Sequence, residues 1–430
     1  MNIPLLSMFC IFTFLMFFGM PLCFCMLFSS LVYLLAGGQT PWIIVHQMFC
    51  GIDTFTLMAI PFFMLAGELM VYSGTAEKLL GFANVTVGRF RGGLAYVNVL
   101  ASMLFGGCSG SAISDVAGLG PLEIRMMEKG GYNKAFSAAL TISSAIQGPI
   151  IPPSIPLVLV GAVTGISIGG LLLGGAIPGV LVGIAQCLVI FLISKRRNFP
   201  RFEAKSGLAE TAKIMAGAVP FLLMPFIILG GIIGGVCTPT EASAAAVLYG
   251  LVLILAYKRG RVDLKSLSKV FIRAGVLSAS ILMLAGASNV FGWILSVEKV
   301  PAALANLLLS ITDNRWVILL ILNFFLLIWG MLMDSLPAIL ILVPILHPLA
   351  RNAGISEIHF GVMVTLNLAI GLITPPYGAA LFTGSIVSGL PIEKIVKQML
   401  PFVIASMCVL FIITYIPKIV TWLPALFGLL

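Results

Sequence analysis

The chain has 430 residues, of which 60% are hydrophobic and only 9% are charged. Soluble domains carry about 25% charged residues, so this composition excludes a soluble protein. Tracts without Asp, Glu, Lys or Arg fill most of the sequence, and at about 20 apolar residues per crossing they provide room for about ten membrane spans. The sequence therefore predicts an all-α polytopic membrane protein.

The net charge of +9 comes from basic residues that lie in the breaks between apolar tracts. A nucleic-acid-binding surface would instead gather them on one face, so we expect no nucleic-acid partner. Lys and Arg concentrate in the cytoplasmic loops of membrane proteins. The basic loops therefore indicate which connections face the cytoplasm.

The first 36 residues are one apolar run, about 54 Å long as a helix and too long for one crossing. The break Gly19-Met20-Pro21 splits this run into two spans, and residues 54–72 form a third. No basic region of a cleavable signal precedes the first run, so we expect it to be retained. A basic loop with Lys78, Arg89 and Arg91 follows the third span.

From Gly92 an apolar stretch reaches the small residues Ser109-Gly110-Ser111 and then returns to basic residues near Arg125. Because both ends of the stretch are basic, it is predicted to be a re-entrant helical hairpin, and two full crossings are the alternative. The helix that follows meets four prolines between positions 149 and 156, and no α-helix continues through that density of proline. We therefore predict a broken helix.

Residues 177–193 form another span, and 195–213 are a basic, hydrophilic linker near the middle of the chain. Beyond it the sequence repeats, with matched residues 223 or 224 positions apart. The matched pairs are Arg91/Arg315, Gly106/Gly330, Ser111/Ser335, Gly131/Gly354, Ser144/Asn367, Pro152/Pro375, Pro153/Pro376 and Pro178/Pro401. A near-constant offset over some ninety residues indicates two copies of one unit.

The first copy is assigned to residues 1–194, with scaffold helices in 1–72 and a hairpin plus broken helix in 92–165. The second copy is assigned to 214–430, with scaffold helices in 214–297 and a hairpin plus broken helix in 316–388. Loop 75–92 carries a net charge of +2 whereas its counterpart 298–315 is neutral. This difference predicts copies of inverted topology, each with five spans plus one hairpin, and both termini outside the cytoplasm.

Inverted repeats with broken helices are typical of secondary transporters, whose site lies between the repeats. An unwound helix offers carbonyl oxygens to a cation, and the ends of half-helices attract an anion. The tip Ser109–Ser111 would face the break Pro149–Ser154, and Asp334-Ser335 would face Thr374-Pro375-Pro376. The alternative is that these are kinks and small packing residues without a ligand.

Acidic residues at membrane depth are costly and usually functional. Asp334 is the first candidate for a cation site and Asp115 the second. For Glu68 and Glu241 a structural role is at least as well supported, because Thr238-Pro239-Thr240-Glu241 has the pattern of a helix cap.

Enzyme motifs are poorly matched. Gly107-Cys108-Ser109-Gly110 resembles a nucleophile elbow, but position 111 is Ser where the motif needs Gly. No Walker lysine follows a glycine-rich loop, so transport would draw on an ion gradient rather than on ATP. The eight cysteines lack metal-ligand spacing and are predicted to be buried hydrophobes. A membrane-embedded enzyme remains the alternative from another class.

Six segments resemble the large membrane subunit of tripartite ATP-independent periplasmic (TRAP) transporters, of the DctM type. They are Ala59–Met70, Ser109–Ala112, Gly131-Tyr132, Gly148–Pro156, Thr238–Ala242 and Gly371–Pro376. The resemblance implies a sodium-coupled importer of the bacterial inner membrane, with an elevator-type ion transporter fold. It also implies two partners, a small four-helix membrane subunit (DctQ type) and a periplasmic substrate-binding protein (DctP type). A stand-alone ion-coupled anion transporter of the same superfamily is the nearest alternative.

The resemblance also implies site residues. One sodium ion would be held by Ser109, Ser111 and the carbonyl groups around Pro149, Pro152 and Ser154. A second would be held by Asp334, Ser335, Thr374 and Gly378. The substrate, an organic acid with a carboxylate, would contact Ser109, Gly110, Ser111, Ser154, Ser335 and Pro376. Asp115 and Asn367 are further possible contributors.

Overall fold

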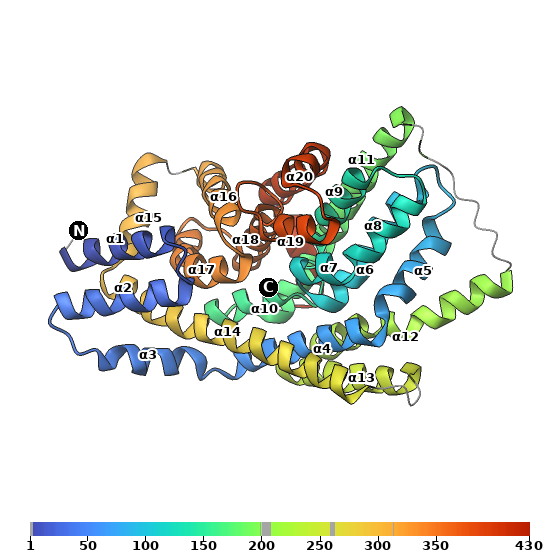
Figure 1. Ribbon diagram of the computed structural model, residues 1–430. Helices are drawn as coiled ribbons and strands as arrows, with labels where there is room; N and C mark the ends of the chain where they lie inside the picture. Colours follow the sequence, from blue (N-terminus) through green and yellow to red (C-terminus); the bar gives the residue numbers. More distant parts are fainter. Residues whose placement is uncertain (1–2, 198, 200–207, 259–262, 313) are drawn as a thin grey trace.

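The structure, a computed structural model, describes residues 3–197, 199, 208–258, 263–312 and 314–430, and every regular element within these ranges is a helix (Figure 1). Eight of them are long and apolar enough to cross a membrane, or nine when one bent pair counts as a span. The predicted all-α polytopic class is therefore confirmed. The count of ten crossings stays a prediction, because α1 and α2 have only 15 residues each.

The elements in chain order are α1 (Ile3–Phe17), α2 (Leu22–Ala36), α3 (Trp42–Ile52), η1 (Phe55–Met58), α4 (Ala59–Ser73), α5 (Thr75–Val87), α6 (Gly93–Ser109), α7 (Ala112–Gly118), α8 (Gly120–Lys129), α9 (Lys134–Ser144), η2 (Ala145–Gln147), α10 (Ile155–Thr164), α11 (Ile168–Arg197), α12 (Leu208–Ile233), α13 (Pro239–Lys258), α14 (Leu264–Val297), α15 (Val300–Ile311), α16 (Arg315–Leu332), α17 (Ser335–Asn352), α18 (Glu357–Gly371), α19 (Ala379–Ser388), α20 (Ile392–Tyr415) and α21 (Lys418–Leu426). The η elements are short 3-10 helices. The linker predicted at 195–213 falls mostly outside the described residues.

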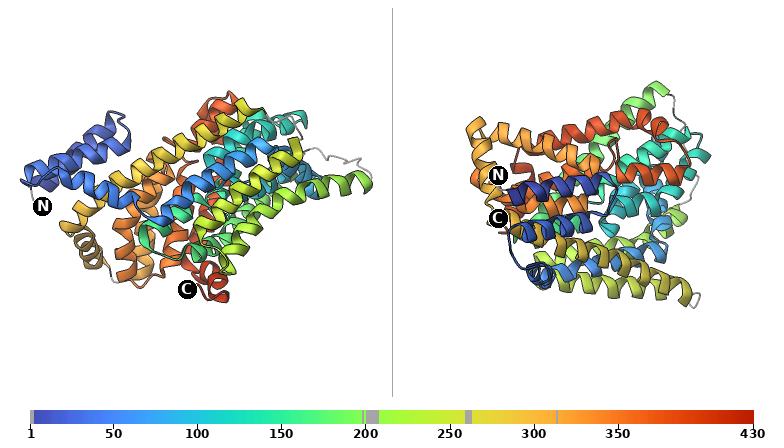
Figure 2. Two further views of the ribbon diagram at one scale, coloured as in Figure 1. Left: turned by 90° about the horizontal axis from the view of Figure 1, so that it is seen from below. Right: turned by 60° about the vertical axis from the view of Figure 1, so that its left-hand side comes forward.

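One side of the molecule is a layer of long helices from both halves of the chain. Helix α13 packs along α4, and α14 runs past α2, α3 and α4 (Figures 1 and 2). Gly19 has φ +76°, which favours glycine, and it separates α1 from α2 at the predicted break. The layer thus joins helices of 1–72 to helices of 214–297, and its role as a scaffold stays a prediction.

The other side holds the hairpins and the broken helices. The axes of α6 and α7 differ by 120° across Ser109–Ser111, so the chain turns back at the predicted tip. Helix α9 ends in η2, and α10 begins only at Ile155, after the proline-rich break. In the second half, α16 and α17 meet at Asp334. Residues 372–378 form the break that separates α18 from α19. Both predicted breaks are therefore present.

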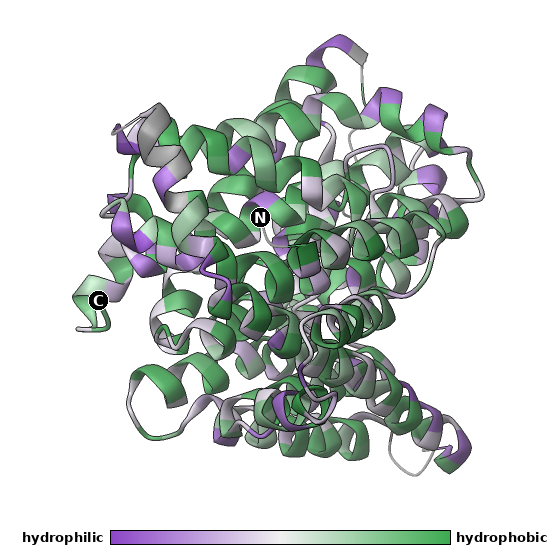
Figure 3. Cartoon of the chain, turned by 90° about the vertical axis from the view of Figure 1, so that its left-hand side faces the viewer, coloured by the Kyte–Doolittle hydropathy of each residue, from purple (hydrophilic) through white to green (hydrophobic). Residues whose placement is uncertain are grey.

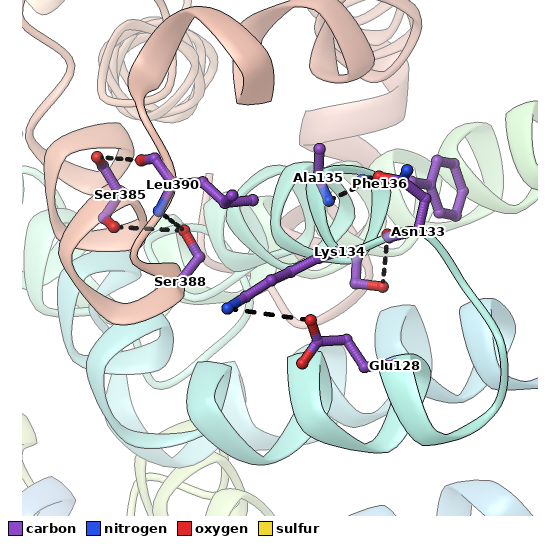
Figure 4. Close-up of polar contacts among 9 residues, drawn as sticks. Glu128, Asn133, Lys134, Ala135, Phe136, Ser385, Ser388 and Leu390 are labelled. Carbon is purple, nitrogen blue, oxygen red and sulfur yellow. Dashed lines mark hydrogen bonds and ion pairs between the residues drawn. The ribbon is translucent and has the colours of Figure 1, made fainter.

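The two halves pack on each other reciprocally. Helix α10 of the first half lies on α17 of the second, and α19 of the second half lies on α7, α8 and α9 of the first. Figure 4 shows polar contacts of the turn after α19 and of the turn between α8 and α9 in this region. There the Ser385 hydroxyl donates to the Leu390 carbonyl oxygen (2.6 Å) and Asn133 caps α9. Reciprocal contacts are what two related units produce when they interlock.

Matched positions also have matched contacts. The Ser144 hydroxyl donates to Asn98 Oδ1 at the crossing of α6 and α9 (3.0 Å). Its counterpart Asn367 donates to Asn323 Oδ1 at the crossing of α16 and α18 (2.8 Å). These contacts support the internal repeat, while the inverted orientation of its copies stays a prediction.

Hydrophobic residues cover most of the helical surface, and hydrophilic residues gather toward helix ends and connections (Figure 3). Many large apolar side chains are exposed, including Phe17 at 81%, Phe226 at 71% and Leu255 at 68%. Such a surface suits hydrocarbon rather than water.

Close glycine contact between α16 and α18 generates a prediction. A Cβ added to Gly371 would lie 2.5 Å from the Gly330 Cα, which belongs to backbone and cannot move aside cheaply. Gly371→Ala should therefore lower the free energy of unfolding by about 1–3 kcal/mol. Thermal unfolding of the purified chain in detergent measures the change.

The matched control is Gly275→Ala in α14, where the added Cβ meets nothing within 4 Å. This variant should unfold at or slightly above the wild-type temperature, because alanine is the better helix former. An unchanged unfolding temperature for Gly371→Ala would contradict the close packing.

Candidate functional site

A small cavity of about 50 Å³ lies between α4 and both hairpin tips. Six of the predicted site residues line it: Ser109, Gly110, Ser111, Pro149, Asp334 and Ser335. The cavity also receives the first turns of α10 and α17, through Ile155, Pro156 and Leu336. Residues far apart in the sequence, from both copies, therefore share one space.

The first hairpin tip is built from local caps. Ser111 is the N-cap of α7, with its side chain accepting from the Ser114 backbone N–H at 3.5 Å. Gly110 has φ +65°, and a Cβ there would lie 2.8 Å from the Pro153 carbonyl oxygen. Only glycine fits this close approach. The tip is thus held directly against the first break.

Asp115 lies behind this tip rather than on the cavity wall. Its side chain is 2% exposed, and its Oδ1 accepts a hydrogen bond from the Ser109 hydroxyl. Its Oδ2 has no hydrogen-bond partner, and a Cβ added to Gly148 would come within 2.5 Å of that oxygen. A buried carboxyl oxygen therefore faces the junction of tip and break without a protein donor.

The first break is held by its own serine. The Ser154 hydroxyl donates to the Pro149 carbonyl oxygen, and its oxygen accepts from the Leu157 N–H at 3.2 Å as the N-cap of α10. Ser154 and Pro152 are buried, and neither lines the cavity, which Pro149 reaches. Ser154 thus forms hydrogen bonds with backbone groups that the interruption of the helix leaves without partners.

At the second tip, Asp334 is the N-cap of α17. Its Oδ1 accepts from the Ser335 N–H at 2.6 Å and from the Ser335 hydroxyl at 3.2 Å. The N–H groups of Tyr377 and Gly378 donate to the Met331 carbonyl oxygen at 3.2 and 3.4 Å. These bonds hold the second break against its tip, as in the first copy.

Three predicted residues of the second break do not reach this cavity. The Thr374 hydroxyl donates to the Ile370 carbonyl oxygen at 2.7 Å, and Gly378 is buried beside it. Pro376 is exposed on the surface. Thr374, Pro376 and Gly378 are therefore absent from the lining of this cavity, and their part in a second sodium site stays a prediction.

The remaining candidates lie elsewhere. Asn367 is buried at the crossing of α16 and α18, outside the cavity lining. Glu241 accepts from the Thr238 N–H at 2.7 Å and from its hydroxyl at 2.9 Å, which is the predicted cap of α13. Glu68 lines the cavity, and its Oε1 lies 3.4 Å from Arg273 Nε.

One fully buried acid, Glu123, was not predicted from the sequence. It accepts from Asn98 Nδ2 at 3.0 Å and from the Ser102 hydroxyl at 3.2 Å, and it is also hydrogen-bonded to Thr141. The network ties α6 and α8 to α9. The available signal was helical spacing, because the buried residues Gly120, Glu123, Ile124 and Met127 share one face of α8.

The arrangement offers hydroxyl groups, backbone carbonyls and the first turns of half-helices around one cavity. Among the described residues, no group of three or more His, Cys, Asp or Glu side chains could hold a metal ion. The helices α10 and α17 direct the positive ends of their dipoles toward the cavity. Such a cavity is suited to reversible binding of cations and anions.

Comparisons with known proteins place the chain in a class. Residues 9–419 match the family described as tripartite ATP-independent periplasmic transporter, DctM component. The chain is 41% identical to the sialic acid TRAP transporter large permease protein SiaM of Vibrio cholerae, over 96% of each protein. It is 37% identical to the isethionate TRAP transporter permease protein DctMQ of Oleidesulfovibrio alaskensis, over 97% of this chain and 66% of that protein.

A solved structure resembles the fold. The Alcanivorax borkumensis YdaH transporter, described as having an unusual topology, superimposes with a TM-score of 0.62 at 14% identity. The match covers 87% of this chain and 86% of that one. At this identity the likeness speaks for the fold alone.

The fold and its relatives define a multi-pass membrane transport protein rather than an enzyme. More specifically, the chain belongs to the DctM family, the large permease subunits of TRAP transporters. The family resemblance predicted from the motifs is confirmed.

Glu123 generates the prediction for this site. Glu123→Ala should lower the free energy of unfolding by about 1–3 kcal/mol, because it removes the buried acceptor that Asn98 and Ser102 share. Glu128→Ala, on the same helix, is the matched control. Its ion pair with Lys134 spans 4.0 Å between side chains 35% and 46% exposed. Exposed pairs contribute at most about 1 kcal/mol. Equal effects in thermal unfolding would contradict the network.

Proposed function

We propose that this chain is the translocating subunit of a sodium-coupled TRAP importer of organic acids, working by an elevator mechanism. The single observation that carries the proposal is the cavity shared by the two hairpin tips, Ser109–Ser111 and Asp334-Ser335. Binding sites at the junction of two repeats, beside interrupted helices, are typical of secondary transporters.

Sodium coupling is supported by the unsatisfied oxygen at the first tip. Among the described residues, Asp115 has no ion-pair partner, and its Oδ2 has no donor. A buried carboxylate without a counter-charge is costly, so a cation or a proton would complete it. Ser109, next to it, lines the cavity. We propose that sodium binds here as a transported ion, between Ser109, Asp115 and the carbonyl groups of the break.

An organic acid is supported as cargo by the anion-attracting side of the cavity. Hydroxyls of Ser109, Ser111 and Ser335 reach it, and the starts of α10 and α17 present positive dipole ends. The relatives SiaM and DctMQ are named for sialic acid and isethionate, both organic anions. We propose that the acidic group of the cargo lies between the two tips.

An elevator movement is supported by the arrangement in two bodies. Helices α3, α4, α13 and α14 pack into one layer, whereas the hairpins and broken helices interlock across the two copies. In the proposed movement, the interlocked body carries the cavity past the layer.

The family supports the proposed partners and location, because it is described as a tripartite, periplasmic transporter. The relative DctMQ extends well beyond the matched region, and we propose that a small membrane subunit corresponding to its remainder joins this chain. A periplasmic binding protein would deliver the cargo, and the location would be the bacterial inner membrane with both termini periplasmic.

Uptake into proteoliposomes tests the proposal. Vesicles holding this chain and its small subunit, given the binding protein and labelled organic acids, should accumulate label only with an inward sodium gradient. Ser109→Ala and Asp334→Ala should reduce that uptake at least tenfold, since each removes a proposed ligand worth about 1.4 kcal/mol or more.

The matched control is Ser280→Ala, an exposed serine of α14 whose hydroxyl only returns to its own helix. It should transport normally. Sodium-independent uptake would contradict the coupling. Uptake without the binding protein would instead favour the stand-alone transporter.

The orientation of the copies is tested by labelling from one side. Arg89 and Lys299 are exposed residues of the matched loops 75–92 and 298–315. Cys10, Cys50 and Cys408 are exposed, so the prediction that the cysteines are buried was wrong for these three. In a background with these three replaced by Ser, an impermeant thiol reagent applied to the cytoplasmic side should label Arg89→Cys and spare Lys299→Cys. Labelling of both from the same side would contradict inverted topology.

A further inference from the structure

A second cavity lies on the boundary between the layer of long helices and the interlocked body. It measures about 340 Å³ and is lined by α3 and α14 of the layer and by α10 and α17 of the body. Gln47 and Asn289 are among the polar side chains of its layer wall, and its described lining contains no Asp, Glu, Lys, Arg or His. The cavity is therefore polar but uncharged.

The second cavity and the transport cavity share the same helices at different levels. Helix α14 reaches the transport cavity through Leu277 and the second cavity through Asn289. A separation of 12 residues corresponds to about 18 Å along a helix. Helix α10 lines the transport cavity from its first turn, at Ile155, and the second cavity from its last turn, at Ala162. The two cavities therefore follow one another along a single boundary.

Two amide side chains form the polar part of the layer wall. Asn289 Nδ2 donates to the Gln47 backbone carbonyl oxygen at 2.8 Å and to Gln47 Oε1 at 3.3 Å. A Cβ added to Gly51 would collide with the Asn289 side chain, so α3 and α14 touch here and hold both amides in place.

The amide pair keeps unused hydrogen-bonding capacity. Within the part of the chain that the structure describes, Gln47 Nε2 and Asn289 Oδ1 have no hydrogen-bond partner. One donor and one acceptor, side by side and without charge, complement a hydroxyl or an amide group, because such groups both donate and accept. A lipid tail or an empty packing defect would leave both atoms unused.

We infer that Gln47 and Asn289 form the layer's part of the binding site in the opposite state of the transporter. The inference rests on the proposed elevator movement. A shift of the body by about 18 Å along α14 would bring the two tips from the level of Leu277 to the level of Asn289. There the tips hold the acidic group of the cargo, and the amides bind its uncharged part. The cargo is thus an organic acid that also carries a hydroxyl or amide group.

Cysteine cross-linking in membrane vesicles tests whether the tips reach the second cavity, in the cysteine-replaced background described above. Leu336, in the first turn of α17, lines the transport cavity. Gly292 lines the second cavity, and a Cβ there meets nothing within 4 Å. A short bifunctional thiol reagent should join Leu336→Cys to Leu277→Cys in the present state and to Gly292→Cys in the opposite state. Reaction of the Leu277 pair without any Gly292 product would overturn the inference.

The matched control is Leu336→Cys with Gly275→Cys. Gly275 is also a glycine of α14 with open space around its Cα, but it lines neither cavity. This pair should not react in either state, and a product equal to that of the Gly292 pair would overturn the assignment to the second cavity.

Uptake by Gln47→Glu tests the role of the amides, with labelled sialic acid, isethionate and succinate as probes. The substitution keeps the Oε1 atom that accepts from Asn289, but it replaces the free donor by a charged oxygen that repels an anion. The KM of sodium-driven uptake should therefore rise about fivefold or more, with kcat within about twofold of the wild type. Cross-linking of Leu336→Cys to Gly292→Cys should be unaffected, since the movement itself does not need the amide.

Gln39→Glu, in an exposed connection that lines neither cavity, is the matched control and should keep the wild-type KM. An equal rise in this control would reduce the effect to overall charge and overturn the inference, as would an unchanged KM in Gln47→Glu. Sialic acid and isethionate carry hydroxyl groups and succinate does not, so a wild type that prefers succinate would also overturn it. Sodium-independent uptake with intact cross-linking to Gly292→Cys would instead refute the proposed coupling and leave this inference supported.

Discussion

The structure depends on one constraint, the cost of leaving backbone polar groups unpaired in hydrocarbon. This chain interrupts a helix twice, and each interruption is closed against the hairpin tip of its own copy. In the first copy Ser154 caps the resumed helix and bonds the Pro149 carbonyl oxygen. In the second, the Met331 carbonyl oxygen receives two N–H groups of the break. The serines of both tips, Ser109, Ser111 and Ser335, line one cavity.

The two copies meet this constraint in different surroundings. Pro152 and Pro153 of the first break are buried, whereas Pro375 and Pro376 of the second are exposed. Helix α4 contributes to the difference, because it packs on both α6 and α10 and approaches the first tip through Gly67. The two breaks therefore share a sequence pattern but differ in how far their prolines are exposed.

This inequality explains how far the sequence could predict the site. Proline and glycine act locally, so the positions of Gly110, Pro149 and both breaks followed from the residues themselves. Which side of a break is covered depends on helices distant in the sequence, so nothing local separated Pro376 from Ser335. Glu123 was missed for a related reason. Its segment carries Arg125, Glu128 and Lys129, and it has the composition of an exposed loop although one face is buried.

The two buried acids of the first hairpin differ in their hydrogen-bond partners, and this difference separates their roles. Glu123 is surrounded by side-chain donors from Asn98, Ser102 and Thr141, so its carboxyl group is satisfied by the protein and serves to join three helices. Asp115 receives the Ser109 hydroxyl at one oxygen and nothing at the other. Because burial penalises an unpaired carboxylate, Asp115 gains from an external cation in a way that Glu123 does not. Burial alone therefore does not distinguish Asp115 from Glu123; the unfilled bonding position beside the Ser109–Ser111 tip does.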